Sequence, residues 1–386
     1  MFVEGRINLL RHRYDNLSLF ADASYEAFEL VYRWMYTDVL PRSNVSQELL
    51  REVCHIAFRY HFKGLQSRCV QHLKARVDVS SCISLYEFAD TEDIGDLRDY
   101  CGAIIAAHWN EFVPQQFAHL SAPSLYQLLK RRRTSGSNFD ASTPKCRRNS
   151  HHILHSIVHL NREDVLLLYF IENDSKVPIL VNALDQSGLS PLELALSSGH
   201  INMANQLLSK NASCNVIDGS GKSILVRMIE KGDALACEFL ASAGADLAFV
   251  HEKTRSNLLH FIAVSPLNQA AMAEWAESRL REMSMDAPDY KNRTAVLLSI
   301  ASGNFSLANT LIVNGADLVK SDVDGRSPLS VALFERNDLA LAATIVDRGA
   351  TGVVNHRIDK GLPFDAALTI FLKLAKAKIK EYRILF

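Results

Sequence analysis

Cysteine is scarce in this sequence, and its arrangement argues against the two structural uses that cysteine most often has. The 386 residues include seven cysteines, and no two of them form a CxxC pair. An odd, sparse and scattered set is typical neither of a disulfide framework nor of a zinc-binding module. We therefore expect free, buried thiols in a reducing compartment. The seven are Cys54, Cys69, Cys82, Cys101, Cys146, Cys214 and Cys237.

Neither sign of charge is in excess, and no apolar targeting segment opens the chain. Lys and Arg together number 42, against 43 for Asp and Glu, so the totals point neither to nucleic acid nor to a strongly acidic substrate. The opening residues, MFVEGRINLLRHRYDN, lack the apolar core of a signal peptide. Apolar residues make up 48% of the sequence, which is enough for large cores in two or three domains.

Long hydrophobic runs are also missing, although one uncharged stretch has the length of a membrane span. The sequence from Thr294 to Ala316 contains no charged residue and reaches the length of a membrane span. It is interrupted by Gly303 and Asn304, and the helical pattern restarts after them. Because glycine followed by asparagine is a turn signal, we interpret the stretch as two short helices joined by a turn.

Motifs of catalysis are missing as well. There is no nucleophile elbow, Walker loop, HExxH motif or Rossmann glycine pattern. Gly219-Ser-Gly-Lys-Ser223 superficially resembles a phosphate loop, but it lacks the first glycine at the required spacing, and no strand precedes it. We expect no enzymatic activity, no catalytic residues and no cofactor-binding residues.

A group of histidines offers one metal-site hypothesis. His151, His155 and His159 are four residues apart on one helical face, and Cys146 is near. That spacing can hold a transition metal. The interpretation that we prefer makes His155 and His260 structural residues that hydrogen-bond between turns. We therefore expect no metal site.

The clearest break in the chain is at 131–150, RRRTSGSNFDASTPKCRRNS, which is rich in Ser and Arg and lacks apolar periodicity. This is linker composition, and we place the linker at 133–150. The basic run Lys130–Arg133 at its start is interpreted as a solvated segment. A nuclear-import signal or an anionic-lipid patch is the alternative.

After the linker, the sequence repeats itself at roughly the 33-residue period of ankyrin repeats. Each repeat has a helix-start segment and an acid three positions before it. The segments begin at Gly188, Gly221, Arg255, Asn292 and Gly325, and the acids are Asp185, Asp218, Glu252, Asp289 and Asp322.

The residues within each repeat suit a tight turn followed by two antiparallel helices. Ser190 is placed to cap a helix with its hydroxyl, and Pro191 then sits at the first helical position, where its missing N–H costs nothing. Gly199, Gly232 and Gly303 are placed to end first helices in a left-handed conformation. A turn and a helix pair at this period predict an ankyrin-repeat solenoid.

We expect about six ankyrin repeats over 151–355. One unit at 151–187 precedes the five helix-start segments, and the unit at 255–291 is degenerate, with extra length around Pro266–Trp275. A divergent C-terminal helix is expected over 356–386. Its lysines interleave with apolar residues, which suits a membrane-surface helix and equally a cap on the open end of the stack.

The N-terminal region is predicted to be helical, with a possible short strand at Leu17–Phe20. Two apolar helix faces are read from the periodicity. The first consists of Tyr25, Phe28, Val31, Tyr32 and Met35, and the second of Leu49, Leu50, Val53, Ile56, Ala57 and Tyr60.

Residues 1–74 resemble the C-terminal half of a BTB (POZ) domain, and 75–132 resemble the BACK-like helical extension that often follows it. The matching segments are Leu17–Phe20, Tyr25–Phe28, Tyr32–Asp38 and Gly64–Leu73 for the first, and Cys82–Tyr86, Tyr100–Trp109 and Phe117–Ser121 for the second. The resemblance implies a mostly α chain in which a partial BTB fold and its helical extension precede the ankyrin solenoid.

This order of domains resembles rabankyrin, the family of endosomal proteins with BTB, ankyrin-repeat and FYVE domains. The resemblance implies a scaffold that binds a GTP-bound Rab GTPase at the cytoplasmic surface of early endosomes, in endocytosis and macropinocytosis. Membrane contact in that family is through a FYVE finger, which is absent from this sequence, as is an Asn-Pro-Phe motif. We therefore expect a fragment without cofactors. The alternative is a substrate adaptor of a cullin ubiquitin ligase, which the incomplete BTB half disfavours.

Overall fold

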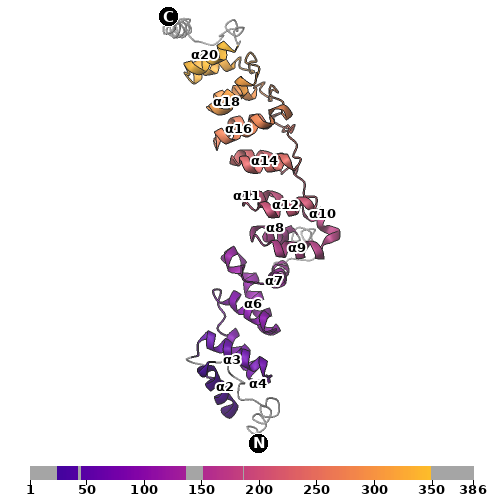
Figure 1. The fold of residues 1–386 in the computed structure, drawn as a ribbon, viewed down its shortest axis with the longest axis vertical. Coiled ribbons are helices and arrows are strands. Elements are labelled where there is room, and N and C mark those ends of the chain that lie inside the picture. Colours follow the sequence, from indigo (N-terminus) through magenta and orange to yellow (C-terminus); the bar gives the residue numbers. More distant parts are fainter. Residues whose placement is uncertain (1–23, 42–44, 136–150, 186, 349–386) are drawn as a thin grey trace. The chain divides into compact units, whose positions relative to one another are not determined.

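The computed structural model describes residues 24–41, 45–135, 151–185 and 187–348 (Figure 1). Over these residues the chain is built from helices, with isolated β-bridges and no strand. It divides into two compact units, 1–180 and 181–386. The expected strand at 17–20, most of the linker and the expected C-terminal helix at 356–386 lie outside the described residues.

The first unit is a set of antiparallel helices joined by short connections. Consecutive helices pack against each other from α2 to α3, from α3 to α4 and from α5 through α7. The helices are α2 (Tyr25–Thr37), α3 (Gln47–Arg59), α4 (Lys63–Lys74), α5 (Cys82–Thr91), α6 (Gly95–Ala107), α7 (Ala122–Ser135), α8 (His151–His159), α9 (Glu163–Glu172) and α10 (Val177–Leu180).

The apolar face predicted for α2 is partly wrong. Val31 and Met35 are buried as predicted, but Tyr25 and Tyr32 are 79% and 52% exposed. The buried stripe passes through Trp34 instead. Trp34 packs on the start of α4, where a Cβ on Gly64 would lie 3.3 Å from the indole ring. The face predicted for α3 is confirmed for its central residues, since Leu50, Val53, Ile56 and Ala57 are buried.

The basic run expected to be a solvated linker lies on α7, so that prediction is wrong for Lys130–Arg132. These side chains tie α7 to its neighbours in the first unit, and burial lowers the pKa of the Arg132 guanidinium. Their partners are Glu172 for Lys130 (Nζ–Oε2 2.5 Å), Asp99 for Arg131, and Ser156 for Arg132 (Nη1–Oγ 3.1 Å), which also lies over the Trp109 ring.

The second unit repeats one motif, a tight turn followed by two antiparallel helices, as the sequence predicts for ankyrin repeats. First helices pack on first helices of the next repeat, and second on second, as Figure 1 shows for α14, α16 and α18. The pairs are α11 (Pro191–Ser197) with α12 (Ile201–Ser209), α13 (Ile224–Lys231) with α14 (Ala234–Ser242), α15 (Leu258–Val264) with α16 (Gln269–Arg279), α17 (Ala295–Ser302) with α18 (Phe305–Val313), and α19 (Pro328–Ser330) continuing through η6 (Val331–Glu335) with α20 (Leu339–Asp347).

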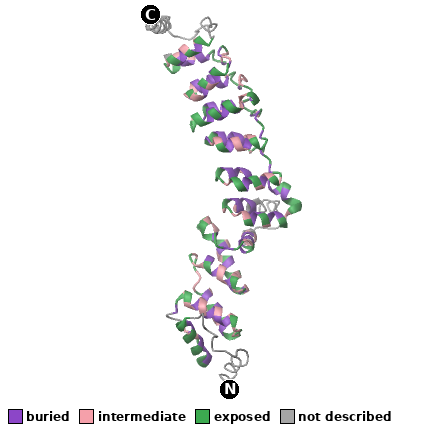
Figure 2. Ribbon diagram, viewed as in Figure 1, coloured by how far each residue is buried: buried purple, intermediate pink, exposed green. Residues whose placement is uncertain are grey.

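Helix ends in this unit follow the local signals. Ser190 caps α11 by accepting a hydrogen bond from the Glu193 N–H, and Pro191 is the first helical residue. Gly232 and Gly303 end α13 and α17 with positive φ, as predicted. Each helix pair buries its inner faces and leaves the outer ones in solvent, which Figure 2 shows as alternating buried and exposed sides.

The uncharged stretch from Thr294 to Ala316 forms α17 and α18 with a turn at Gly303, as predicted. The Asn304 side chain is fully buried in that turn and donates to the Ile262 carbonyl of the preceding repeat, over 3.0 Å. Within the described part of the chain, no helix combines the length and apolar character needed to cross a membrane.

Candidate functional site

The turn that opens a repeat is held by one carboxylate. In the turn before α17, Asp289 Oδ1 accepts hydrogen bonds from the backbone N–H groups of Lys291 and Arg293, each over 2.8 Å. Burial opposes ionisation of Asp289, but these bonds and the Arg293 guanidinium outweigh it and lower the pKa. Asp185, Asp218 and Asp322 accept the same pair of backbone bonds in their own turns.

The turn before α15 departs from this pattern and corrects one prediction. Glu252, expected at the carboxylate position, is exposed, and His251 takes that place, with its Nδ1 accepting from the Thr254 N–H over 3.3 Å. This turn is one residue longer than the others. The His251 N–H donates to the carbonyl of Ser256, five residues on, whereas in the other turns the accepting carbonyl is four residues on. The helix-start residue that caps α15 is Asn257.

Neighbouring turns are joined to each other through their backbones. The Tyr290 N–H donates to the Thr254 carbonyl over 3.0 Å, and the Val323 N–H donates to the Lys291 carbonyl over 3.1 Å. His260 adds a buried link, with Nε2 2.9 Å from the Arg293 carbonyl oxygen, and burial lowers its pKa. This confirms the structural role predicted for His260. The last three turns therefore form one preformed surface.

Beneath the turns, a buried ion pair connects the first helices of two repeats. Glu193 on α11 is fully buried, and its Oε2 lies 2.5 Å from Arg227 Nη2 on α13. Arg227 Nη1 also contacts Asp218 Oδ2 at 3.0 Å and the Gly188 carbonyl at 3.2 Å. Burial raises the pKa of Glu193 to about 7, although Arg227 and Lys231 oppose the rise.

The segment that resembles a phosphate loop has its polar groups engaged within the repeat. Asp218 occupies the backbone N–H groups of Ser220 and Lys222, and Ser223 caps α13. Lys222 Nζ is 2.5 Å from Glu230 Oε1. Burial opposes ionisation of Asp218, but the hydrogen bonds from Ser220 and Lys222 and the nearby Arg227 lower its pKa to about 2. An anionic carboxylate at the centre of this loop would repel a phosphate.

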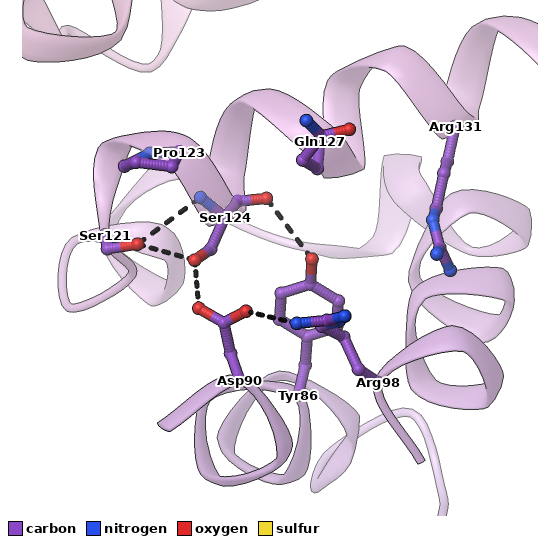
Figure 3. A pocket seen from close by; sticks show the side chains of 8 residues that line it. All are labelled: Tyr86, Asp90, Arg98, Ser121, Pro123, Ser124, Gln127 and Arg131. Carbon is purple, nitrogen blue, oxygen red and sulfur yellow. Dashed lines mark hydrogen bonds and ion pairs between the residues drawn. The ribbon is translucent and has the colours of Figure 1, made fainter. Parts of the chain in front are cut away.

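The first unit contains an open cavity of about 390 Å³ between α5, α6 and α7 (Figure 3). Asp90 accepts from the Ser124 hydroxyl and pairs with Arg98 at 3.3 Å, while the Tyr86 hydroxyl donates to the Ser124 carbonyl at 3.3 Å. These polar groups therefore satisfy one another's hydrogen-bonding needs. Ser124 is 5% exposed, and the Asp90 carboxylate that accepts from its hydroxyl is also paired with Arg98. The lining residues are Tyr86, Asp90, Arg98, Ser121, Pro123, Ser124, Gln127 and Arg131.

The structure describes the side chains of two of the four residues in the metal hypothesis. His155 is buried in α8 and His159 is exposed, while His151 and Cys146 have no described side chains. No three His, Cys, Asp or Glu side chains gather at a metal-binding distance among the described residues. Six cysteines are free and buried, as predicted, and Cys146 lies outside the described residues.

Sequence reasoning found the turn aspartates but missed the Glu193–Arg227 pair and the residues exposed on the turns. The register alone would have placed Tyr290 and Val323 beside the predicted acids Asp289 and Asp322. No sequence signal indicates that Glu193 contacts Arg227, because the distance between the two side chains is set by how two repeats pack.

The chain is similar to rabankyrin-5. It is 30% identical to the protein of Homo sapiens and 31% identical to that of Mus musculus over 321 residues, which are 81% of this chain. The aligned region is 26% of each of those proteins, so this chain spans about a quarter of their length. The chain is therefore rabankyrin-like over most of its length, and the resemblance inferred from the sequence is confirmed.

Other comparisons are weaker. The p105 subunit of nuclear factor NF-kappa-B from Gallus gallus is 27% identical over 52% of this chain and 20% of its own length. Among solved structures, the ankyrin repeat domain of Bcl-3 is similar, with a TM-score of 0.44 and 22% identity over 55% of this chain and 88% of that one. No protein-family model matches the chain.

Proposed function

We propose that this rabankyrin-like chain is a non-catalytic protein-interaction scaffold. The observation that supports it is the row of the last three described turns of the second unit, whose backbones are hydrogen-bonded from one repeat to the next. A preformed surface binds with a smaller loss of conformational entropy than a flexible one. The cavity of the first unit supports the same proposal, because its serine, carboxylate and arginine groups are engaged with each other.

More specifically, we propose that the partner is a GTP-bound Rab GTPase and that the chain acts at the surface of early endosomes, in endocytosis and macropinocytosis. The support is the similarity to rabankyrin-5 over 81% of the chain. The assignments of 1–74 as a partial BTB domain and of 75–132 as its helical extension stay predictions.

The test is calorimetry of the full chain with an early-endosomal Rab GTPase loaded with a GTP analogue or with GDP. We expect the GTP form to bind at least about tenfold more tightly, a difference of about 1.4 kcal/mol. The GDP form is the matched control, because it presents the same protein with a different switch conformation.

Equal affinity for the two nucleotide forms, or no binding to either, would contradict the Rab proposal for this chain. A purified cullin tested in the same way addresses the alternative. Saturable cullin binding without any Rab binding would favour the substrate adaptor over the Rab effector.

A further inference from the structure

Three apolar side chains stand in solvent on the last three turns of the second unit. Val250, Tyr290 and Val323 are 50%, 54% and 67% exposed. Each lies at a turn and not on a helix face that packs in the core, so its exposed area faces solvent. Apolar side chains that gather on an exposed surface mark sites of interaction.

The turns that carry these side chains are fixed relative to each other. The bond from the Tyr290 N–H to the Thr254 carbonyl joins the turn before α17 to the turn before α15, and the bond from the Val323 N–H to the Lys291 carbonyl joins the turn before α19 to the turn before α17. The buried carboxylate of Asp289 holds the central turn from inside. The three turns that carry Val250, Tyr290 and Val323 therefore form a row in a rigid frame.

Positive charge lies on two of the three turns in this row. Lys253, Arg255 and Lys291 are exposed, and within the described part of the chain none of them takes part in a recorded ion pair. Lys291 Nζ lies 5.4 Å from the centre of the Tyr290 ring. Arg293 is also near that ring, but Asp289 neutralises it at 2.6 Å. Glu252 is the one unpaired acid described on the turns before α15 and α17, so these two turns carry an excess of positive charge.

We propose that this turn surface, made of Val250, Tyr290, Val323, Lys253, Arg255 and Lys291, binds an acidic segment of a partner protein that carries an aromatic or aliphatic side chain. The apolar residue of the partner packs on the row, and its carboxylates face the three cations. This inference deepens the proposed scaffold function and rests on it, but it does not require the partner to be a Rab GTPase.

The composition of the turn surface favours a protein segment over a nucleic acid. Single-stranded nucleic acids bind where several aromatic rings offer stacking planes along a basic groove. On the turn surface Tyr290 is the one aromatic ring, and Val250 and Val323 offer no stacking plane. An acidic peptide with one large apolar residue matches both the charges and the aliphatic groups.

The test uses the full chain and a fluorescein-labelled random copolymer of glutamate and tyrosine, with binding followed by fluorescence anisotropy. We expect Tyr290→Ser to weaken binding about tenfold, because aromatic residues at the centre of an interface carry much of its affinity. The Lys253→Glu/Lys291→Glu variant is expected to weaken binding by a similar factor at low salt and less at high salt, because salt screens exposed charges.

Two matched controls keep the test specific. Leu235→Ser removes another exposed apolar side chain, 84% exposed on α14, and Arg281→Glu reverses another exposed charge. Neither is expected to change copolymer binding. If polyglutamate binds as tightly as the copolymer, or if the controls weaken binding as much as the turn variants do, the proposal is overturned.

Further outcomes separate this proposal from the others. If phosphatidylserine-containing vesicles bind in a Tyr290-dependent manner while the copolymer does not, the surface faces a membrane and the acidic-segment proposal is wrong. Loss of copolymer binding in the turn variants with unchanged binding of the GTP-loaded Rab would support the turn surface and place the Rab contact elsewhere. If the turn variants lose Rab binding but keep their copolymer binding, the proposal that the turn surface binds an acidic segment is contradicted.

Discussion

The Arg227→Met variant is expected to lose about 3 kcal/mol of unfolding free energy at pH 8, because it leaves the Glu193 carboxylate buried without its nearest cation. Glu193 is fully buried, and Arg227 Nη2 is 2.5 Å from its Oε2. Removing one partner of a buried ion pair typically costs 3–5 kcal/mol. Lys231 remains at 4.0 Å from Oε1, which places the expected loss at the lower end of that range.

The loss should be smaller at pH 5.5. Burial raises the pKa of Glu193 to about 7, above the value of about 4.3 for an exposed glutamate. Between these values the unfolded chain releases a proton that the folded chain keeps, so this group's contribution to stability is complete below pH 4.3 and falls as the pH rises toward 7. Without Arg227 the pKa of Glu193 rises further, and the cost of ionisation grows with pH.

Urea unfolding followed by circular dichroism at pH 5.5 and pH 8 measures both effects. The matched control is the double variant Glu193→Met/Arg227→Met, which removes both charges. Replacing a buried pair with apolar groups is often neutral or stabilising, so this variant should recover the part of the loss that comes from Glu193 and show no extra loss at pH 8. Both variants lose the contact between Arg227 and Asp218. An Arg227→Met variant whose loss is the same at both pH values would contradict the pKa assigned to Glu193.

The second large effect is expected from Gly232→Ala, at the end of α13. Gly232 has a φ of +69°, and a Cβ there would lie 2.8 Å from the Leu267 Cβ and 3.0 Å from the Leu267 backbone. Leu267 lies in the connection between α15 and α16, and the next residue, Asn268, donates from its side chain to the Gly232 carbonyl over 2.8 Å. We expect a loss of about 3 kcal/mol, since backbone strain and steric overlap add together.

Gly199→Ala is the matched control for Gly232→Ala. Gly199 has a similar φ of +73° after α11, but a Cβ there would meet nothing within 4 Å. This variant should lose only the cost of the left-handed conformation, about 1 kcal/mol. Thermal unfolding of both variants measures the difference. Equal losses would mean that the segment at Leu267 moves aside without cost, and that only the backbone conformation matters.

Much of the second unit could be predicted from sequence because its signals act over a few residues. Ser190 accepts from a backbone N–H three residues ahead, Pro191 has the φ of a first helical residue, and Gly303 adopts a left-handed conformation that other residues avoid. The turn between α17 and α18 follows from Gly303 in the same way. Such interactions need no knowledge of the rest of the fold.

The sequence was misleading wherever packing decided the outcome. Tyr25 and Tyr32 have the periodicity of a buried face, but α2 turns its Trp34 side toward Phe62 and Gly64 at the start of α4. The basic side chains at Lys130–Arg132 have linker composition, but they lie on α7 and are paired with Glu172, Asp99 and Ser156.

By itself, then, the sequence determined the helical repeats, their caps and turns, and the likeness to rabankyrin, because each depends on residues close together in the chain or on the order of whole segments. Only the tertiary structure decided that Glu193 meets Arg227, that His251 replaces Glu252 in its turn, and that the turns of Val250, Tyr290 and Val323 are bonded to one another. Apart from His251 and Glu252, which belong to one turn, these groups come from different repeats, and their distances are set by how the repeats pack.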